Sequence, residues 1–62
     1  MYKIKVKEVR LKLGLTQEEF AQKFHISLSY YKKIESGARV PSINWLDRVA
    51  EKLNVPFTDL LS

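Results

Sequence analysis

The 62-residue sequence contains no cysteine, so neither a disulfide nor a thiolate zinc site can hold the chain together. No stretch approaches the roughly 20 apolar residues that a membrane-spanning helix needs. The N-terminus alternates lysine with apolar residues, so we expect no signal peptide either. A chain of this length has room for one domain, residues 1–62, which helix packing or self-association must stabilise.

Glycine and proline are scarce, with two of each, and each stands at a break between stretches of helical periodicity. Gly14 and Gly37 come where helices can end, because glycine adopts the left-handed conformation at low cost. The pattern predicts an all-α fold of five short helices, at about residues 3–13, 17–24, 28–36, 43–53 and 58–61. For the first segment a short strand is the alternative, since residues 2–6 alternate apolar residues with lysine.

Hydroxyl side chains precede four of the predicted helices. Thr16 and Glu19 have the spacing of a capping box, in which each side chain accepts a hydrogen bond from the other residue's backbone. Ser27, Ser42 and Thr58 are placed to cap the next three helices. The apolar residues that we expect to face the core are Val6, Val9, Leu13, Phe20, Ala21, Phe24, Tyr31, Ile34, Leu46, Val49, Ala50 and Leu53.

Residues 16–36 have the spacing of a helix-turn-helix. The small Ala21 allows a second helix to cross closely, and His25 stands where the turn needs a residue that tolerates positive φ. Tyr31 and Ile34 are then placed to hold the third helix against the second.

The charge distribution is uneven. The formal net charge is +4, and the basic residues gather in the first two-thirds of the chain, whereas residues 41–62 are slightly acidic. An anion-binding face is therefore expected in the first two-thirds. The single histidine, His25, has no cysteine or second histidine as a co-ligand and no adjacent nucleophile, so we expect no enzyme activity, metal or cofactor.

Three stretches of the sequence, VKEVRLKLGLTQEEFAQKF, IESGARVPS and LDRVAEKLNV, resemble the XRE-like, phage repressor and Cro-type helix-turn-helix family. The resemblance covers about residues 6–61, and it implies a lambda-repressor-like DNA-binding domain. The combination that makes it specific is Arg10, Thr16-Gln17, Ala21, Ile34-Glu35, Gly37 and Pro41-Ser42.

The resemblance implies a sequence-specific regulator of transcription, a repressor, that binds double-stranded DNA with residues 28–36 in the major groove. The positions that match base contacts are Ser27, Leu28, Ser29 and Lys33. Those that match backbone contacts are Gln17, Lys32 and Arg39, and Gln17 would also brace the recognition helix. Lys3 or Lys5 could touch a flanking phosphate, and Arg10 and Glu35 match a structural pair found in some relatives.

Three residues depart from the family pattern. His25 replaces the usual glycine of the turn, which implies backbone strain. Tyr31 stands where Ile or Val is usual, so we expect its ring at the core edge with its hydroxyl in water or hydrogen bonded. Leu28 is apolar, so it can contact a thymine methyl group but cannot read guanine.

Apolar residues near the C-terminus predict self-association. An exposed patch of Trp45, Val55, Pro56, Phe57 and Leu60 would suit a homodimer. The expected location is the cytoplasm of a bacterium or phage host, on the nucleoid when DNA is bound. The alternative function is a protein-interaction module of the same fold, an antitoxin or control protein that acts through a protein partner.

Overall fold

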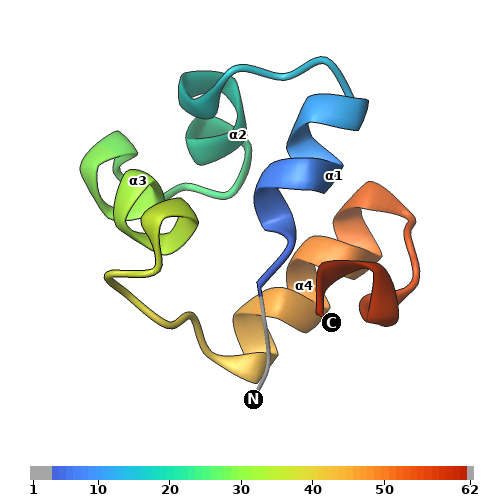
Figure 1. Cartoon of the computed structure of the whole chain (residues 1–62). Helices are drawn as coiled ribbons and strands as arrows, with labels where there is room; N and C mark the ends of the chain where they lie inside the picture. Colours follow the sequence, from blue (N-terminus) through green and yellow to red (C-terminus); the bar gives the residue numbers. More distant parts are fainter. Residues whose placement is uncertain (1–3, 62) are drawn as a thin grey trace.

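A computed structural model describes residues 4–61. The chain forms four α-helices and a closing 3₁₀ turn: α1 (Val6–Lys12), α2 (Gln17–Lys23), α3 (Leu28–Ser36), α4 (Ile43–Leu53) and η1 (Phe57–Leu60). Figure 1 shows α2 and α3 together on one side of the molecule and α1, α4 and the C-terminal turn on the other. The predicted all-α fold is confirmed, and none of the described helices is long and apolar enough to cross a membrane.

The predicted start of the first helix is wrong. The helix begins at Val6, and Ile4 instead pairs with Leu61 in an isolated antiparallel bridge. The backbone N–H of Lys5 donates to the carbonyl of Leu60 at 2.8 Å, so this segment satisfies its polar groups across the chain rather than in a helix. Of the strand alternative, only the bridge between Ile4 and Leu61 is present within residues 4–61. Residues 2 and 3 of the predicted strand lie outside the described residues, and so does the predicted phosphate contact of Lys3.

The closing turn also differs from its prediction. It covers Phe57–Leu60 rather than 58–61, and Thr58 lies inside it instead of capping it. Asn54 ends α4 in the left-handed conformation, and Pro56 then starts the turn by accepting a hydrogen bond from the backbone N–H of Asp59 at 2.9 Å.

The other caps agree with their predictions. The hydroxyl of Thr16 accepts from the N–H of Glu19 at 3.0 Å, and the Glu19 carboxylate accepts from the N–H of Thr16 at 2.8 Å. Ser42 accepts from the N–H of Trp45 at 3.1 Å at the start of α4. Because these side chains take up N–H groups that have no partner within the helix, α2 and α4 begin where the sequence predicts.

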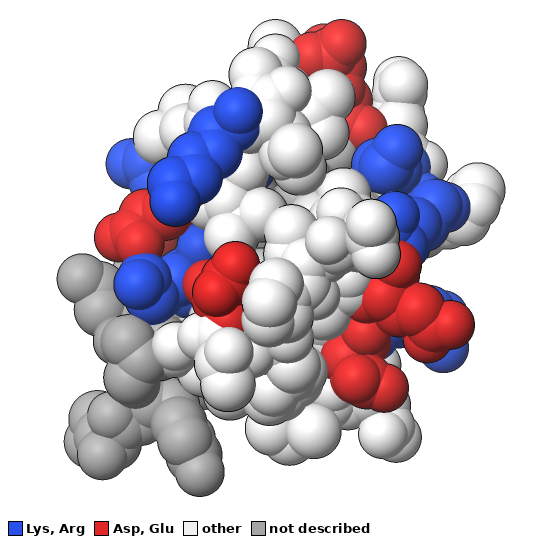
Figure 2. Space-filling model, turned by 90° about the vertical axis from the view of Figure 1, so that its right-hand side faces the viewer, with Lys and Arg blue, Asp and Glu red and all other residues white. Residues whose placement is uncertain are grey.

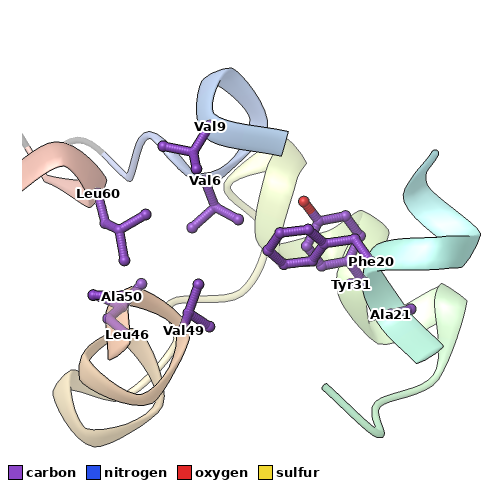
Figure 3. Close-up of a cluster of buried hydrophobic side chains, with 9 residues drawn as sticks. All are labelled: Val6, Val9, Phe20, Ala21, Tyr31, Leu46, Val49, Ala50 and Leu60. Carbon is purple, nitrogen blue, oxygen red and sulfur yellow. The ribbon is translucent and has the colours of Figure 1, made fainter. Parts of the chain in front are cut away.

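The core joins the two sides of the molecule. Aliphatic side chains of α1, α4 and η1 meet on one side, and the rings of Phe20 and Tyr31 stack on the other with centroids 4.9 Å apart (Figure 3). Leu13, predicted to face the core, is 46% exposed. The helix α1 ends at Lys12, and at Leu13 the chain turns away from the core.

Tyr31 lies deeper than predicted. Its side chain is 0% exposed rather than at the core edge, and its hydroxyl is buried without a hydrogen-bond partner among the described residues. Burial raises the pKa of Tyr31, and the nearby carboxylate of Glu35 raises it further. The ring therefore fills the space that a smaller β-branched residue would leave, and the hydroxyl stays protonated.

Candidate nucleic-acid interface

The connection between α2 and α3 is a tight turn built around one left-handed residue. His25 has φ of 56°, as the sequence predicts, and its N–H donates to the carbonyl of Gln22 at 3.2 Å. Ile26 then donates to the carbonyl of Ala21 at 3.0 Å, which closes the chain back onto α2. Ala21 is 2% exposed, consistent with its expected role as the small contact between the helices.

Ser27 caps α3, as predicted. Its hydroxyl oxygen accepts a hydrogen bond from the N–H of Tyr30 at 3.1 Å, while the backbone of Ser27 stays extended. A serine hydroxyl has one donor and two acceptor sites, so the cap leaves the Ser27 proton free to donate elsewhere. Ser27 can therefore start the helix and still offer a polar group beside its N-terminus.

The two sides of α3 differ sharply. Tyr31 and Ile34 are buried and fix one side to the core. Ser29, Lys32 and Lys33 are exposed, and their i, i+3 and i+4 spacing puts them on one common side of the helix. Among the other residues predicted to contact bases, Ser27 is exposed and Leu28 is partly exposed at the first helical position.

The loop after α3 returns along the same helix. The backbone N–H of Arg39 donates to the carbonyl of Lys33 at 3.1 Å. The exposed Arg39 guanidinium stacks over the ring of Tyr30, 5.5 Å from the ring centroid. The predicted Arg39 thus joins the Lys33 region of α3. Tyr30 is absent from the residues predicted from sequence, although an aromatic residue on the outer side of this helix could have signalled it.

Gln17 connects the start of α2 to the end of α3. Its side-chain amide donates to Glu35 at 2.9 Å, and the same carboxylate accepts from the Nε of Arg10 at 2.8 Å. A second Arg10 nitrogen donates to the carbonyl of Leu15 at 2.7 Å. This network ties α1, the segment before α2, and α3 together, so it fixes the angle at which α3 is presented.

The Arg10–Glu35 pair is buried, with the two side chains 9% and 5% exposed. Burial alone would raise the pKa of Glu35, but the hydrogen bonds from Arg10 and Gln17 outweigh it, and the pKa is lowered. Removing one partner of a buried pair typically costs about 3–5 kcal/mol, because the other charge is left unpaired. The pair is thus a structural joint of the scaffold and not an exposed contact.

The face away from α3 has no single sign of charge. Figure 2 shows the side of α1 and the C-terminal turn, where lysine and arginine atoms are interspersed with aspartate and glutamate atoms around a wide uncharged area. One ion pair on α1 joins Lys5 and Glu8 at 3.6 Å. This face offers no continuous basic surface among the described residues (Figure 2). Lys32 and Lys33, on the outer side of α3, take part in neither of the two ion pairs within residues 4–61.

One residue of the predicted dimer patch is buried, and the other four are partly or fully exposed. Leu60 is 0% exposed, so it cannot lie on an exposed patch as the sequence predicts, because η1 folds it into the core. Trp45 is half-buried and packs edge-on against Phe24 at 6.1 Å. Val55 and Phe57 are partly buried, and Pro56 is exposed.

Larger apolar exposure occurs elsewhere. Val40 is 81% exposed and Ile43 58%, and both line a hollow of about 580 Å³ between the α3–α4 loop and the Ile4–Leu61 bridge. These side chains were not among the residues predicted for self-association, because loop residues such as Val40 carry no periodic signal.

Known proteins with similar sequences belong to a helix-turn-helix family, as the geometry of α2 and α3 indicates. Residues 6–60 match the family described as helix-turn-helix (HTH_3). The chain is 42% identical over 53 residues to an uncharacterized HTH-type transcriptional regulator, YqaF, of Bacillus subtilis (strain 168), covering 86% of this chain and 70% of YqaF. It is 34% identical over 59 residues to the control protein C.MunI of Mycoplasma sp, covering 94% and 80%.

A third relative is the cryptic phage CTXphi transcriptional repressor RstR of Vibrio cholerae, 27% identical over 62 residues. The alignment takes in the whole of this chain but 56% of RstR. The matching family is one of regulators and not of enzymes, in agreement with the expectation from sequence. The match over residues 6–60, together with the arrangement of α2 and α3, shows that the chain belongs to the XRE-type helix-turn-helix family of DNA-binding transcriptional regulators.

Proposed function

We propose that this regulator represses transcription by binding a specific double-stranded DNA sequence with α3 in the major groove. One observation carries the proposal: the exposed side of α3 bears Ser29, Lys32 and Lys33, while its opposite side is fixed by buried Tyr31 and Ile34. A helix held in this way can enter the groove without rearrangement. Similarity to a protein named as a transcriptional repressor supports the direction of regulation.

The N-cap and the outer side of α3 read the bases in this proposal. Ser27, Leu28, Ser29 and Lys33 face base edges, and Lys33 donates to guanine O6 and N7, the commonest specific contact in the major groove. Leu28 packs against a thymine methyl group. Gln17, Lys32 and Arg39 hold phosphates and set the register of the helix on the duplex.

Selection of bound sequences from random duplex DNA tests the proposal. We expect an enriched motif, and binding to it that weakens about 5- to 150-fold in Lys33→Ala with relaxed preference at one base pair. Arg39→Ala should weaken binding to all sequences alike. Lys7→Ala is the matched control, because Lys7 is an exposed lysine on α1, away from α3. Absence of any enriched motif at low and moderate salt would contradict the proposal.

We further propose that the protein binds as a homodimer on two half-sites about 34–36 Å apart. Two apolar surfaces are candidates to meet a second copy: exposed Val40 and Ile43 beside their hollow, and the partly exposed surface of Trp45, Val55, Pro56 and Phe57. Sedimentation velocity of Val40→Glu and Phe57→Glu separates them. The variant that lowers the dimer fraction identifies the surface, and a wild-type monomer at every concentration would exclude the dimer.

The same apolar hollow favours a second candidate function, a module that acts through a protein partner. Salt separates the two candidates, because binding to several phosphates weakens steeply as salt rises, whereas an apolar protein interface does not.

A further inference from the structure

Arg39 is held at two points, one on its backbone and one on its exposed side chain. Its backbone N–H donates to the carbonyl of Lys33 at 3.1 Å, and its guanidinium carbon lies 5.5 Å from the centre of the Tyr30 ring. Tyr30 and Lys33 are one turn apart on α3, so the three residues form one group at the outer side of the helix.

Core packing does not account for the Tyr30 ring. Tyr30 is partly exposed and does not belong to the core cluster or to the apolar residues packed against it, whereas the adjacent Tyr31 is completely buried. The Ser27 cap uses only the backbone N–H of Tyr30. Among the described residues, the interaction that involves the Tyr30 ring is therefore its contact with the Arg39 guanidinium.

We propose that Tyr30 is a positioning residue for DNA binding, whose ring holds the Arg39 guanidinium beside Lys33 so that it meets a backbone phosphate already oriented. The inference rests on the proposed DNA binding. It adds Tyr30 to the DNA-binding surface as a residue that acts through Arg39 rather than by reading a base.

The chemistry of the stack suits a phosphate ligand. A guanidinium that lies over an aromatic face keeps its N–H donors at its edge, where they can bind two phosphate oxygens. A carboxylate partner would instead occupy those donors. The ion pairs within residues 4–61 join Lys5 to Glu8 and Arg10 to Glu35, so the arginine of the stack keeps its donors for a ligand.

Nuclear magnetic resonance of the DNA-free protein tests the stack itself. Side-chain protons of Arg39 should be shifted upfield by the ring current of Tyr30. The shift should persist in Tyr30→Phe, which keeps a ring, and disappear in Tyr30→Leu. Circular dichroism verifies that both variants are folded. Unshifted Arg39 resonances in the wild type would overturn the inference without reference to DNA.

A double-mutant cycle tests the consequence for binding. We expect Tyr30→Leu to weaken binding to the selected duplex about 2- to 5-fold, the effect of an exposed cation–π contact, and Tyr30→Phe to bind like the wild type. Adding Tyr30→Leu to Arg39→Ala should cause no further loss. Adding it to Lys32→Ala should cause the full 2- to 5-fold loss, because Lys32 is outside the stack.

Several results would overturn the proposal. Additive losses in the Tyr30 and Arg39 pair would show that the two residues act independently. Equal losses in Tyr30→Phe and Tyr30→Leu would assign the effect to the hydroxyl. Unchanged binding in Tyr30→Leu while Arg39→Ala weakens it would refute the positioning role alone, whereas no wild-type binding at low salt would remove the proposed function and this inference together.

Discussion

His25 holds a backbone conformation that costs most residues free energy. At φ of 56° its Cβ approaches the following carbonyl oxygen, and for L-residues this conformation is about 1–2 kcal/mol less favourable than the right-handed one. The turn nevertheless requires it, because the N–H of the next residue, Ile26, must reach the carbonyl of Ala21. The family resemblance places glycine here, so this sequence keeps the geometry at some cost in stability.

Replacing His25 by glycine should therefore raise the free energy of unfolding, by about 0.5–1 kcal/mol after the greater chain entropy of glycine is subtracted. Chemical denaturation measures the change. His25→Val is the opposite control and should be destabilising, since a β-branched residue strongly disfavours positive φ. Equal stability of the glycine and valine variants would contradict strain at this turn. Asn54, with φ of 57°, offers a comparison site where the native residue already tolerates the conformation.

Glu35 should make the protein sensitive to acid. Its pKa is lowered in the folded state, so the stabilisation is present above the ordinary value of 4.5 and is lost as the pH falls through the folded value. We expect the free energy of unfolding to be level near neutral pH, to begin falling at about pH 5, and to continue falling below 4.5. Thermal unfolding followed between pH 3 and 7 measures it, with those limits chosen to bracket roughly that window.

The matched variant for this test removes both charges, as in Arg10→Met with Glu35→Leu. Such a replacement of a buried ion pair is often tolerated and can be stabilising. It should remove most of the acid-induced loss, leaving the smaller contribution of Glu19, whose pKa is lowered by the backbone and hydroxyl of Thr16. An unchanged pH profile in the double variant would assign acid sensitivity to other groups.

At the scale of elements, caps decide where the helices begin. Ser27 and Ser42 make the same contact, each accepting from a backbone N–H three residues later at 3.1 Å. They differ in place, because Ser27 lies at the proposed DNA surface and Ser42 begins α4. Comparing variants of the two serines therefore distinguishes a role in capping from a role in DNA binding.

Ser27→Ala and Ser42→Ala should each lower the free energy of unfolding by about 1 kcal/mol. DNA affinity, measured where both variants remain folded, should fall only in Ser27→Ala. Ser27→Asp keeps a capping oxygen but adds a negative charge near phosphates, so it should restore stability and not affinity. Equal affinities of the two alanine variants would remove Ser27 from the set of proposed DNA contacts.

Local chemistry made the middle of the chain predictable. The ranges 28–36 and 43–53 coincide with α3 and α4, because a serine cap and a left-handed residue bound each one. The start of α1 was not predictable in the same way, since the Ile4–Leu61 bridge joins residues from opposite ends of the chain. A contact of that range leaves no periodic signal in either segment.

The site was only partly predictable for the same reason. Lys32 and Lys33 follow directly from helical spacing beside the buried Tyr31. The stack of Tyr30 on Arg39 depends on how the loop after α3 folds back, which spacing within the helix does not encode. The burial of Leu60 likewise depends on η1 packing against α4 and α1.

At the scale of the whole molecule, net charge alone does not define the DNA surface. The formal charge of +4 is the balance of 11 Lys and Arg against 7 Asp and Glu. Some of the 11 cations are neutralised in ion pairs such as Arg10–Glu35, and lysines elsewhere are interspersed with acidic residues (Figure 2). The cations proposed to meet phosphates or bases are Lys32, Lys33 and Arg39, all of them exposed. The number of counterions released on binding should therefore reflect these few residues and not the overall charge.

This distinction gives a measurable slope. If Lys32 and Arg39 each neutralise one phosphate, the logarithm of the binding constant should fall with the logarithm of salt concentration with a slope of about −1.8 for one protomer and about −3.6 for two. Lys32→Ala should make the dimer slope less steep by about 1.8, because each half-site loses one contact, whereas Lys7→Ala should leave it unchanged. A slope of about −3.6 together with a dimer in sedimentation would fit two copies on one operator. A slope near zero would instead favour the protein-interaction function, since an apolar interface releases no condensed counterions.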